Sequence, residues 1–173
     1  MFEGWDDFYL LIGGASGGLI GLLFIVVTLI QGNDGGLKLK AAAAYMTPTV
    51  AHLAVVLVMC ATATAPHLTP PIAGGLFLGG ALVCLGFSGR ALYMLAGGGI
   101  NAAHWSDVWG YGVAPFIAAA ALAVAAAAAW IAPGWAILGI AVSLVAMLLI
   151  AVRNAWDLVT WISAGGGSPS ADG

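Results

Sequence analysis

The chain has 173 residues, of which 4 are Lys or Arg and 7 are Asp or Glu, and 62% of its residues are hydrophobic. Charged residues make up only 6%, whereas soluble domains carry about 25%, so an ordinary soluble domain is excluded, and the high hydrophobicity excludes a disordered chain. Two cysteines are too few for a disulfide scaffold, and a net charge of −3 argues against a nucleic-acid partner. The class that remains is a polytopic membrane protein.

Five stretches are apolar enough to cross a membrane, since a spanning helix needs about 20 mostly apolar residues. The first, residues 8–30, contains no charge. The second ends near Ala65, and its start is open: Thr47-Pro48 is typical of a helix N-terminus, but residues 41–46 could also be helical. The others cover residues 71–96, 113–132 and 135–163.

The expected fold is therefore an all-α integral membrane bundle of five transmembrane helices. It forms one domain over residues 1–164, and the Gly/Ser/Pro-rich tail at 165–173 is expected to be disordered. We expect the first span to be retained rather than cleaved, because Glu3, Asp6 and Asp7 precede it where a signal peptide is basic.

The basic residues predict an orientation. Lys38 and Lys40 lie between the first two spans, Arg90 lies near the end of the third span, and Arg153 lies near the end of the fifth. If the loop with the two lysines is cytoplasmic, all four basic residues lie on the cytoplasmic side. We therefore expect the N-terminus outside and the C-terminus in the cytoplasm.

Glycines recur at the spacing that lets transmembrane helices approach closely. They occupy the first span at Gly13, Gly14, Gly17, Gly18 and Gly21, and the third span at Gly75 and Gly79. One interpretation is tight packing within one bundle. The alternative is that one of these ladders forms a subunit interface, either in a homo-oligomer or in a heteromeric membrane complex.

Ionisable and amide residues gather at one predicted depth. Because a helix rises about 1.5 Å per residue, several segments bring polar groups to the cytoplasmic end of the spans. This candidate polar layer comprises His52, Arg90, His104, Asp107, Arg153, Asn154 and Asp157. Polar groups inside membranes are costly and therefore mark candidate functional sites.

Each member of this layer also has a structural interpretation. Arg153 and Asp157 are four residues apart and can pair on one helical face, either as an interfacial pair with a snorkelling arginine or as the lining of a water-filled vestibule. His52 is either a hydrogen-bonded structural residue or a ligand. His104 and Asp107 alone do not make a metal site, so we expect no metal and no cofactor.

Three short stretches of the sequence are similar to stretches found in a known protein family. They are Thr47-Pro48-Thr49-Val50-Ala51-His52, Tyr111-Gly112-Val113-Ala114-Pro115 and Arg153-Asn154-Ala155-Trp156-Asp157-Leu158-Val159. Together with the glycine-rich first span, they resemble a family of small multi-pass bacterial inner-membrane proteins with no assigned activity. The resemblance implies a location in the bacterial inner membrane and transfers no catalytic residue.

Three functions remain open. The first is an oligomeric small channel or permeation-type protein whose cytoplasmic mouth is the polar layer. The second is a non-catalytic accessory or scaffold subunit of a larger membrane complex, docked through the glycine ladders. The third is a lipid-binding protein or membrane enzyme centred on His52, His104 and Asp107. No nucleophile elbow, phosphate-binding loop or zinc-protease motif is present in the sequence. We therefore place an enzymatic function behind the other two.

Overall fold

The computed structural model describes residues 2–31, 36–96 and 105–163, and within these ranges every regular element is a helix. The elements are α1 (Asp6–Gln31), α2 (Gly36–Ala63), α3 (Pro70–Ala96), α4 (Trp105–Asp107), the π-helix η1 (Val108–Val113), α5 (Ala114–Ala128) and α6 (Pro133–Ser163). Five helices are long and apolar enough to cross a membrane, the fourth being the continuous run of α4, η1 and α5. The all-α class is thereby confirmed for the described residues, and the five predicted spans correspond to these five long, apolar helices.

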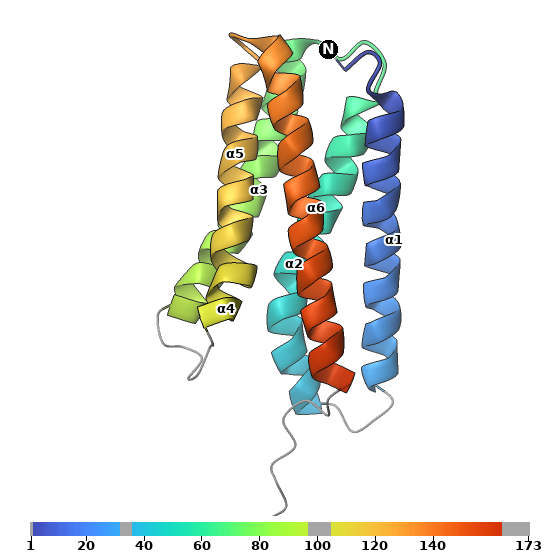
Figure 1. Ribbon diagram of the computed structural model, residues 1–173, viewed down its shortest axis with the longest axis vertical. Coiled ribbons are helices and arrows are strands. Elements are labelled where there is room, and N and C mark those ends of the chain that lie inside the picture. Colours follow the sequence, from blue (N-terminus) through green and yellow to red (C-terminus); the bar gives the residue numbers. More distant parts are fainter. Residues whose placement is uncertain (1, 32–35, 97–104, 164–173) are drawn as a thin grey trace, which may run out of the picture.

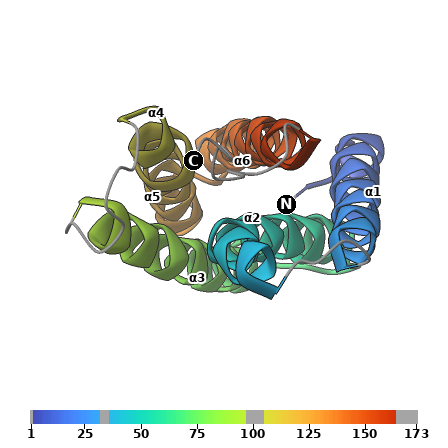
Figure 2. The ribbon, with the colours of Figure 1, turned by 90° about the horizontal axis from the view of Figure 1, so that it is seen from below.

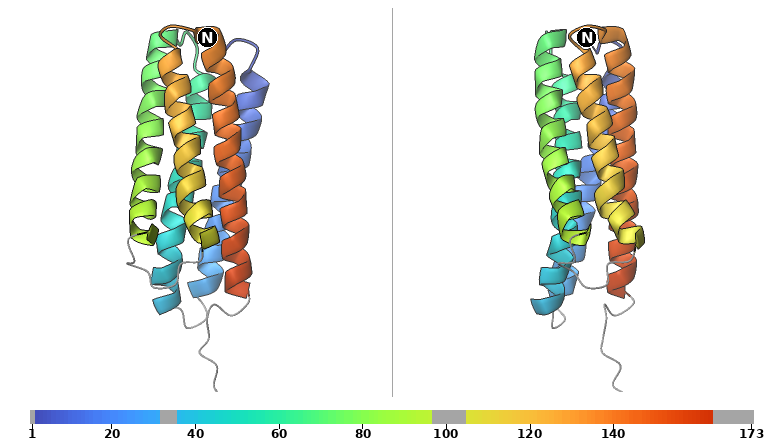
Figure 3. Two further views of the ribbon diagram at one scale, coloured as in Figure 1. Left: turned by 60° about the vertical axis from the view of Figure 1, so that its left-hand side comes forward. Right: turned by 90° about the vertical axis from the view of Figure 1, so that its left-hand side faces the viewer.

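The long helices lie side by side with their axes roughly aligned (Figure 1). Seen along the bundle, α2, α3, α5 and α6 form a four-membered group, and α1 lies at its edge (Figure 2). The helix α1 packs mainly against α2 and less extensively against α6. The two side views in Figure 3 show the same order. One face of α1 is therefore left without a neighbouring helix in the described part of the chain.

Small residues allow the helices of the group to approach one another. A Cβ added to Gly74 of α3 would lie 3.0 Å from the carbonyl oxygen of Ala126 in α5, and one added to Gly139 of α6 would lie 2.8 Å from the Cβ of Ala125. The alanine-rich sequence of α5 thus fits between two helices that carry glycine at the contact. Close backbone approach of this kind holds helices together in lipid, where burial alone does not.

Helix α2 begins earlier than a start at Thr47-Pro48 would require. It runs from Gly36 and continues through Pro48, so the alternative in which residues 41–46 are helical is confirmed. The expectation that Lys38 and Lys40 lie in a loop is wrong, because both belong to the first turns of α2. A proline inside a membrane helix is tolerated because neighbouring groups can satisfy the backbone that it leaves unpaired.

The segment before the fourth span is helical rather than a loop. Residues 105–113 form α4 and η1, and the expected start at Val113 is therefore too late. The span also ends at Ala128 rather than Ala132, because the backbone N–H groups of Trp130 and Ile131 donate to the carbonyls of Ala127 and Ala128 in a turn. His104 and the predicted tail lie outside the described residues.

The predicted packing glycines divide into two groups. A Cβ on Gly13 would lie 3.0 Å from the Cβ of Cys60, so Gly13 is where α1 meets α2. At the other positions a Cβ would have no neighbouring heavy atom within 4 Å, apart from the backbone of its own helix; these are Gly14, Gly17, Gly18, Gly21, Gly75 and Gly79. Among the residues that the structure describes, Gly13 is the one of these seven that packs closely against another helix.

Candidate functional site

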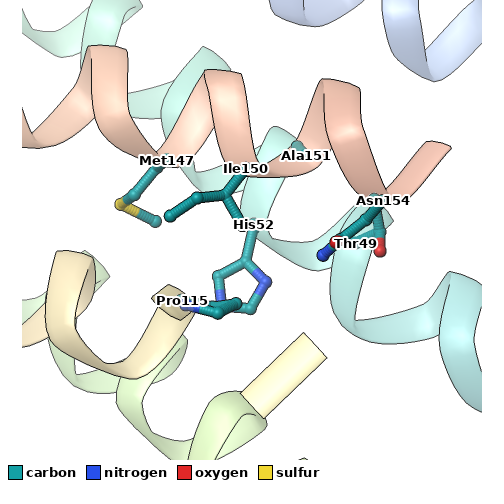
Figure 4. Close-up of a pocket in the computed structure, with 7 residues that line it drawn as sticks. All are labelled: Thr49, His52, Pro115, Met147, Ile150, Ala151 and Asn154. Carbon is teal, nitrogen blue, oxygen red and sulfur yellow. The ribbon is translucent and has the colours of Figure 1, made fainter. Parts of the chain in front are cut away.

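A small pocket lies between α2, α5 and α6 (Figure 4). Its polar lining comes from Thr49 and His52 of α2 and Asn154 of α6, and all three are almost completely buried. Its apolar walls are Pro115, Met147, Ile150 and Ala151. The space open to the centre of a water molecule is about 10 Å³, which is the lower limit for holding one water. The pocket brings together one residue or more from each of the three stretches singled out in the sequence.

A proline explains why Asn154 lies where it does. The Ala114 N–H donates to the carbonyl of Trp109, five residues earlier, as a π-helix requires. The next N–H would serve the carbonyl of Gly110, but that position is Pro115, which has no N–H. The Asn154 Nδ2 donates to the Gly110 carbonyl instead, at 2.9 Å. A backbone oxygen that would otherwise be unpaired inside an apolar bundle is thereby satisfied.

The junction between η1 and α6 is held by a second bond and by close packing. The Tyr111 hydroxyl donates to the backbone carbonyl of Asn154 at 3.0 Å. A Cβ on Gly110 would overlap the guanidinium of Arg153, and a Cβ on Gly112 would lie 2.6 Å from a side-chain carbon of Leu92. Both glycines of η1 are therefore positions at which a side chain cannot be accommodated without movement of a neighbour.

His52 joins α2 to α3. Its Nε2 lies 2.9 Å from the Oγ of Ser88, and both side chains are buried. The backbone carbonyls of Pro48 and Cys84 also face the imidazole. With these partners the ring is a well-satisfied member of the helix interface. Of its two interpretations from sequence, the structural one agrees with this geometry.

Arg153 and Asp157 form an ion pair on the surface of α6. Arg153 Nη2 lies 3.1 Å from Asp157 Oδ2, and the two side chains are 48% and 40% exposed. Arg153 Nη1 also donates to the Oδ1 of Asn154 at 3.3 Å. The pair therefore links the surface to the buried amide, and through it to η1 and the pocket.

The structure does not bring the whole predicted polar layer together. Arg90 lies on the exposed side of α3 and has no hydrogen-bond or ion-pair partner among the described residues. Asp107 is half-buried in α4, where it accepts a hydrogen bond from the Oγ of Ser106 at 3.4 Å. The site is thus made by His52, Asn154 and Arg153, with Asp157 at its edge.

The predicted polar layer lacks three members of the site: Thr49, Ser88 and the Gly110 carbonyl. Thr49 was named only within the stretch that carries the resemblance. Ser88 was missed because a lone serine in a glycine-rich span gives no signal of its own, although it lies on the buried face of α3 that includes Cys84 and Phe77. The Gly110 carbonyl was missed because only the π-helical register leaves it unpaired. Pro115, five residues after Gly110, is the sequence feature that indicates this unpaired carbonyl, because proline has no N–H to donate.

The side chains described at this site offer hydrogen-bond donors and acceptors. Among the described residues, no group of three or more His, Cys, Asp or Glu side chains could hold a metal ion. Cys60 and Cys84 are buried free thiols and do not line the pocket. The arrangement can bind a small polar molecule and can hold three helices in one register.

No family model, curated protein or solved structure matches this chain. The resemblance to small bacterial inner-membrane proteins therefore stays a prediction, and the function has to be argued from the geometry alone.

Proposed function

We propose that this multi-pass protein is a non-catalytic accessory or scaffold subunit of a larger membrane complex, and that it docks other transmembrane helices on outward glycine faces. The observation that carries the proposal is the face of α1 opposite to α2. At 3.6 residues per turn, Gly14, Gly18 and Gly21 fall within about 60° of one another, and none has a neighbouring side chain within 4 Å. Exposed small residues in line are what a second helix needs for close approach.

A second outward face lies on α3. Gly75, Gly79 and Gly86 share one side of this helix and likewise have no neighbour within 4 Å. The helix α3 lies on a different side of the bundle from α1 (Figure 2). Two separate faces suit a subunit that touches more than one neighbour, whereas a simple symmetric dimer needs only one.

The interior supports the same proposal. The buried polar side chains bond to other groups of the chain, as Ser16 does when its Oγ donates to the Leu53 carbonyl at 2.7 Å; within the described ranges, only the hydroxyl of Tyr9 is buried without a partner. An interior whose buried polar groups already bond to neighbouring helices suits a structural subunit better than an enzyme.

The test is co-purification from native membranes with variants of the glycine faces. Gly18→Ile and Gly79→Ile should reduce the recovery of a stoichiometric partner protein, while the bundle remains folded because both positions are open. Ala15→Ile is the matched control, since Ala15 is exposed on α1 and lies off the glycine face. Equal recovery with all three variants, or no partner with the wild-type chain, would overturn the proposal.

A permeation-type function is the second candidate, and the polar pocket favours it. Within one chain, however, the pocket is water-sized, and the interior next to it is filled by fully buried residues such as Leu53 and Leu144. A pathway would therefore have to run between copies of the chain. Ion flux into liposomes that changes with Asp157→Asn would support this function, and flux equal to that of empty liposomes would count against it.

The proposal includes an orientation and a location. The acidic residues Asp6 and Asp7 lie at the end of α1 drawn at the top of Figure 1, whereas α2 begins with its lysines, and α3 and α6 end, at the opposite end. By the positive-inside rule this second end is cytoplasmic. The bacterial inner membrane follows from the resemblance, not from the geometry.

A further inference from the structure

The polar lining of the pocket has unused hydrogen-bonding capacity. A carboxamide can donate two hydrogen bonds and accept two. Asn154 donates one, to the Gly110 carbonyl, and accepts one, from Arg153. One N–H and one lone pair of a side chain that is 4% exposed remain, and this side chain lines the pocket.

Two further polar groups line the same space. Thr49 is 5% exposed. Its hydroxyl can take part in as many as three hydrogen bonds, so it can bond to a ligand in the pocket as well as to a group of the chain. His52 forms a third wall (Figure 4), but its ring nitrogens already have partners in Ser88 and in the carbonyls of Pro48 and Cys84, so it borders the space without offering a further hydrogen bond. The walls on the other side are apolar: Pro115, Met147 and Ile150.

We propose that this pocket is a binding site for a single ordered water molecule, held by the amide of Asn154 and the hydroxyl of Thr49 beside the imidazole of His52. Buried waters occupy sites of this kind, with room for one molecule and two to four polar partners. The water accepts from the Asn154 amide and bonds to Thr49. It thereby joins α6 to α2 and extends the hydrogen-bonded chain that starts at the Asp157–Arg153 pair on the surface.

The size and the lining determine the ligand class. The free space is too small for a larger polar molecule. A metal ion would need several anionic or imidazole ligands, and the pocket offers one histidine and no carboxylate. The site does not depend on the proposed assembly function, because it lies wholly within one chain.

Radiolytic hydroxyl-radical footprinting in lipid nanodiscs tests the site, because a buried side chain is oxidised only where water lies next to it. Met147 lines the pocket and is 2% exposed, whereas Met59 is 6% exposed and packs against Gly80 away from it. Met147 should be oxidised several-fold faster than Met59, and the exposed Met94 provides the upper reference.

Two variants separate bound water from transient opening of the bundle. Thr49→Val keeps the shape of the side chain and removes its hydroxyl. Ala151→Val fills the space from the side of α6. In both, oxidation of Met147 should fall to the rate of Met59, while Met94 is unchanged. Equal rates for Met147 and Met59 in the wild-type chain, or a Met147 rate that neither variant lowers, would overturn the proposal.

Discussion

Asn154 stabilises the bundle where α5 begins, by compensating a backbone defect in the neighbouring segment η1. Pro115 removes the N–H that the Gly110 carbonyl would use, and the amide of Asn154 replaces it at 2.9 Å. An unpaired carbonyl in an apolar interior is costly. Asn154 and Pro115, which are 39 positions apart in the sequence, are therefore expected to be energetically coupled.

This coupling can be measured with two substitutions. Asn154→Leu should lower the free energy of unfolding by about 1–3 kcal/mol, because a buried acceptor loses its partner. In a Pro115→Ala background the loss should be smaller, because the alanine N–H can serve the Gly110 carbonyl. A double-mutant cycle of unfolding in mixed micelles measures this difference, and strictly additive losses would contradict the explanation.

The glycines provide a second comparison at the residue scale. Gly139→Ala places a methyl group 2.8 Å from the Cβ of Ala125, an atom that cannot rotate away, and should destabilise the protein by about 1–3 kcal/mol, the usual cost of overpacking. Gly79→Ala meets no neighbour and should be neutral or slightly stabilising, because alanine favours the helix over glycine. Thermal unfolding of the two variants in one detergent checks this, and equal melting temperatures would contradict the assigned contact.

At the scale of elements, α1 is the helix with the least support. It contacts chiefly α2, through Gly13 against Cys60 and through the bond from Ser16 to the Leu53 carbonyl. Gly13→Val should therefore weaken the docking of α1, whereas Gly14→Val, one residue away, should not.

Limited proteolysis distinguishes these two variants. The variant Gly13→Val should be cut faster near the α1–α2 connection than the wild-type chain, while Gly14→Val should match the wild type. Faster cleavage of both variants would mean that α1 is held by contacts on its outward face as well.

The helices themselves can be predicted from the sequence only in part. Apolar length alone predicts five helices, because lipid admits only helices or closed barrels. It does not predict that α2 runs through Pro48. It also does not predict that residues 108–113 form a π-helix, because this segment is held by Asn154 of α6. For the same reason the residues of the polar layer can be named from sequence, but the inward position of Asn154 and the outward position of Arg90 cannot.

At the scale of the whole molecule, the orientation is directly testable. Cys60 and Cys84 are 3% and 1% exposed, so neither should react with an impermeant maleimide applied to intact cells. Glu3→Cys should be labelled, because the N-terminus is predicted to lie outside. Ser170→Cys should be labelled only after the cells are lysed, and the reverse pattern would contradict the positive-inside assignment.

The proposed role as an accessory subunit depends on what occupies the outward glycine faces of α1 and α3. Native mass spectrometry of the protein extracted with its surrounding membrane measures this most directly. We expect a complex in which the 17.3 kDa chain is bound at a fixed ratio to a different membrane protein. A spectrum that contains only the single chain, or only whole multiples of its mass, would contradict it.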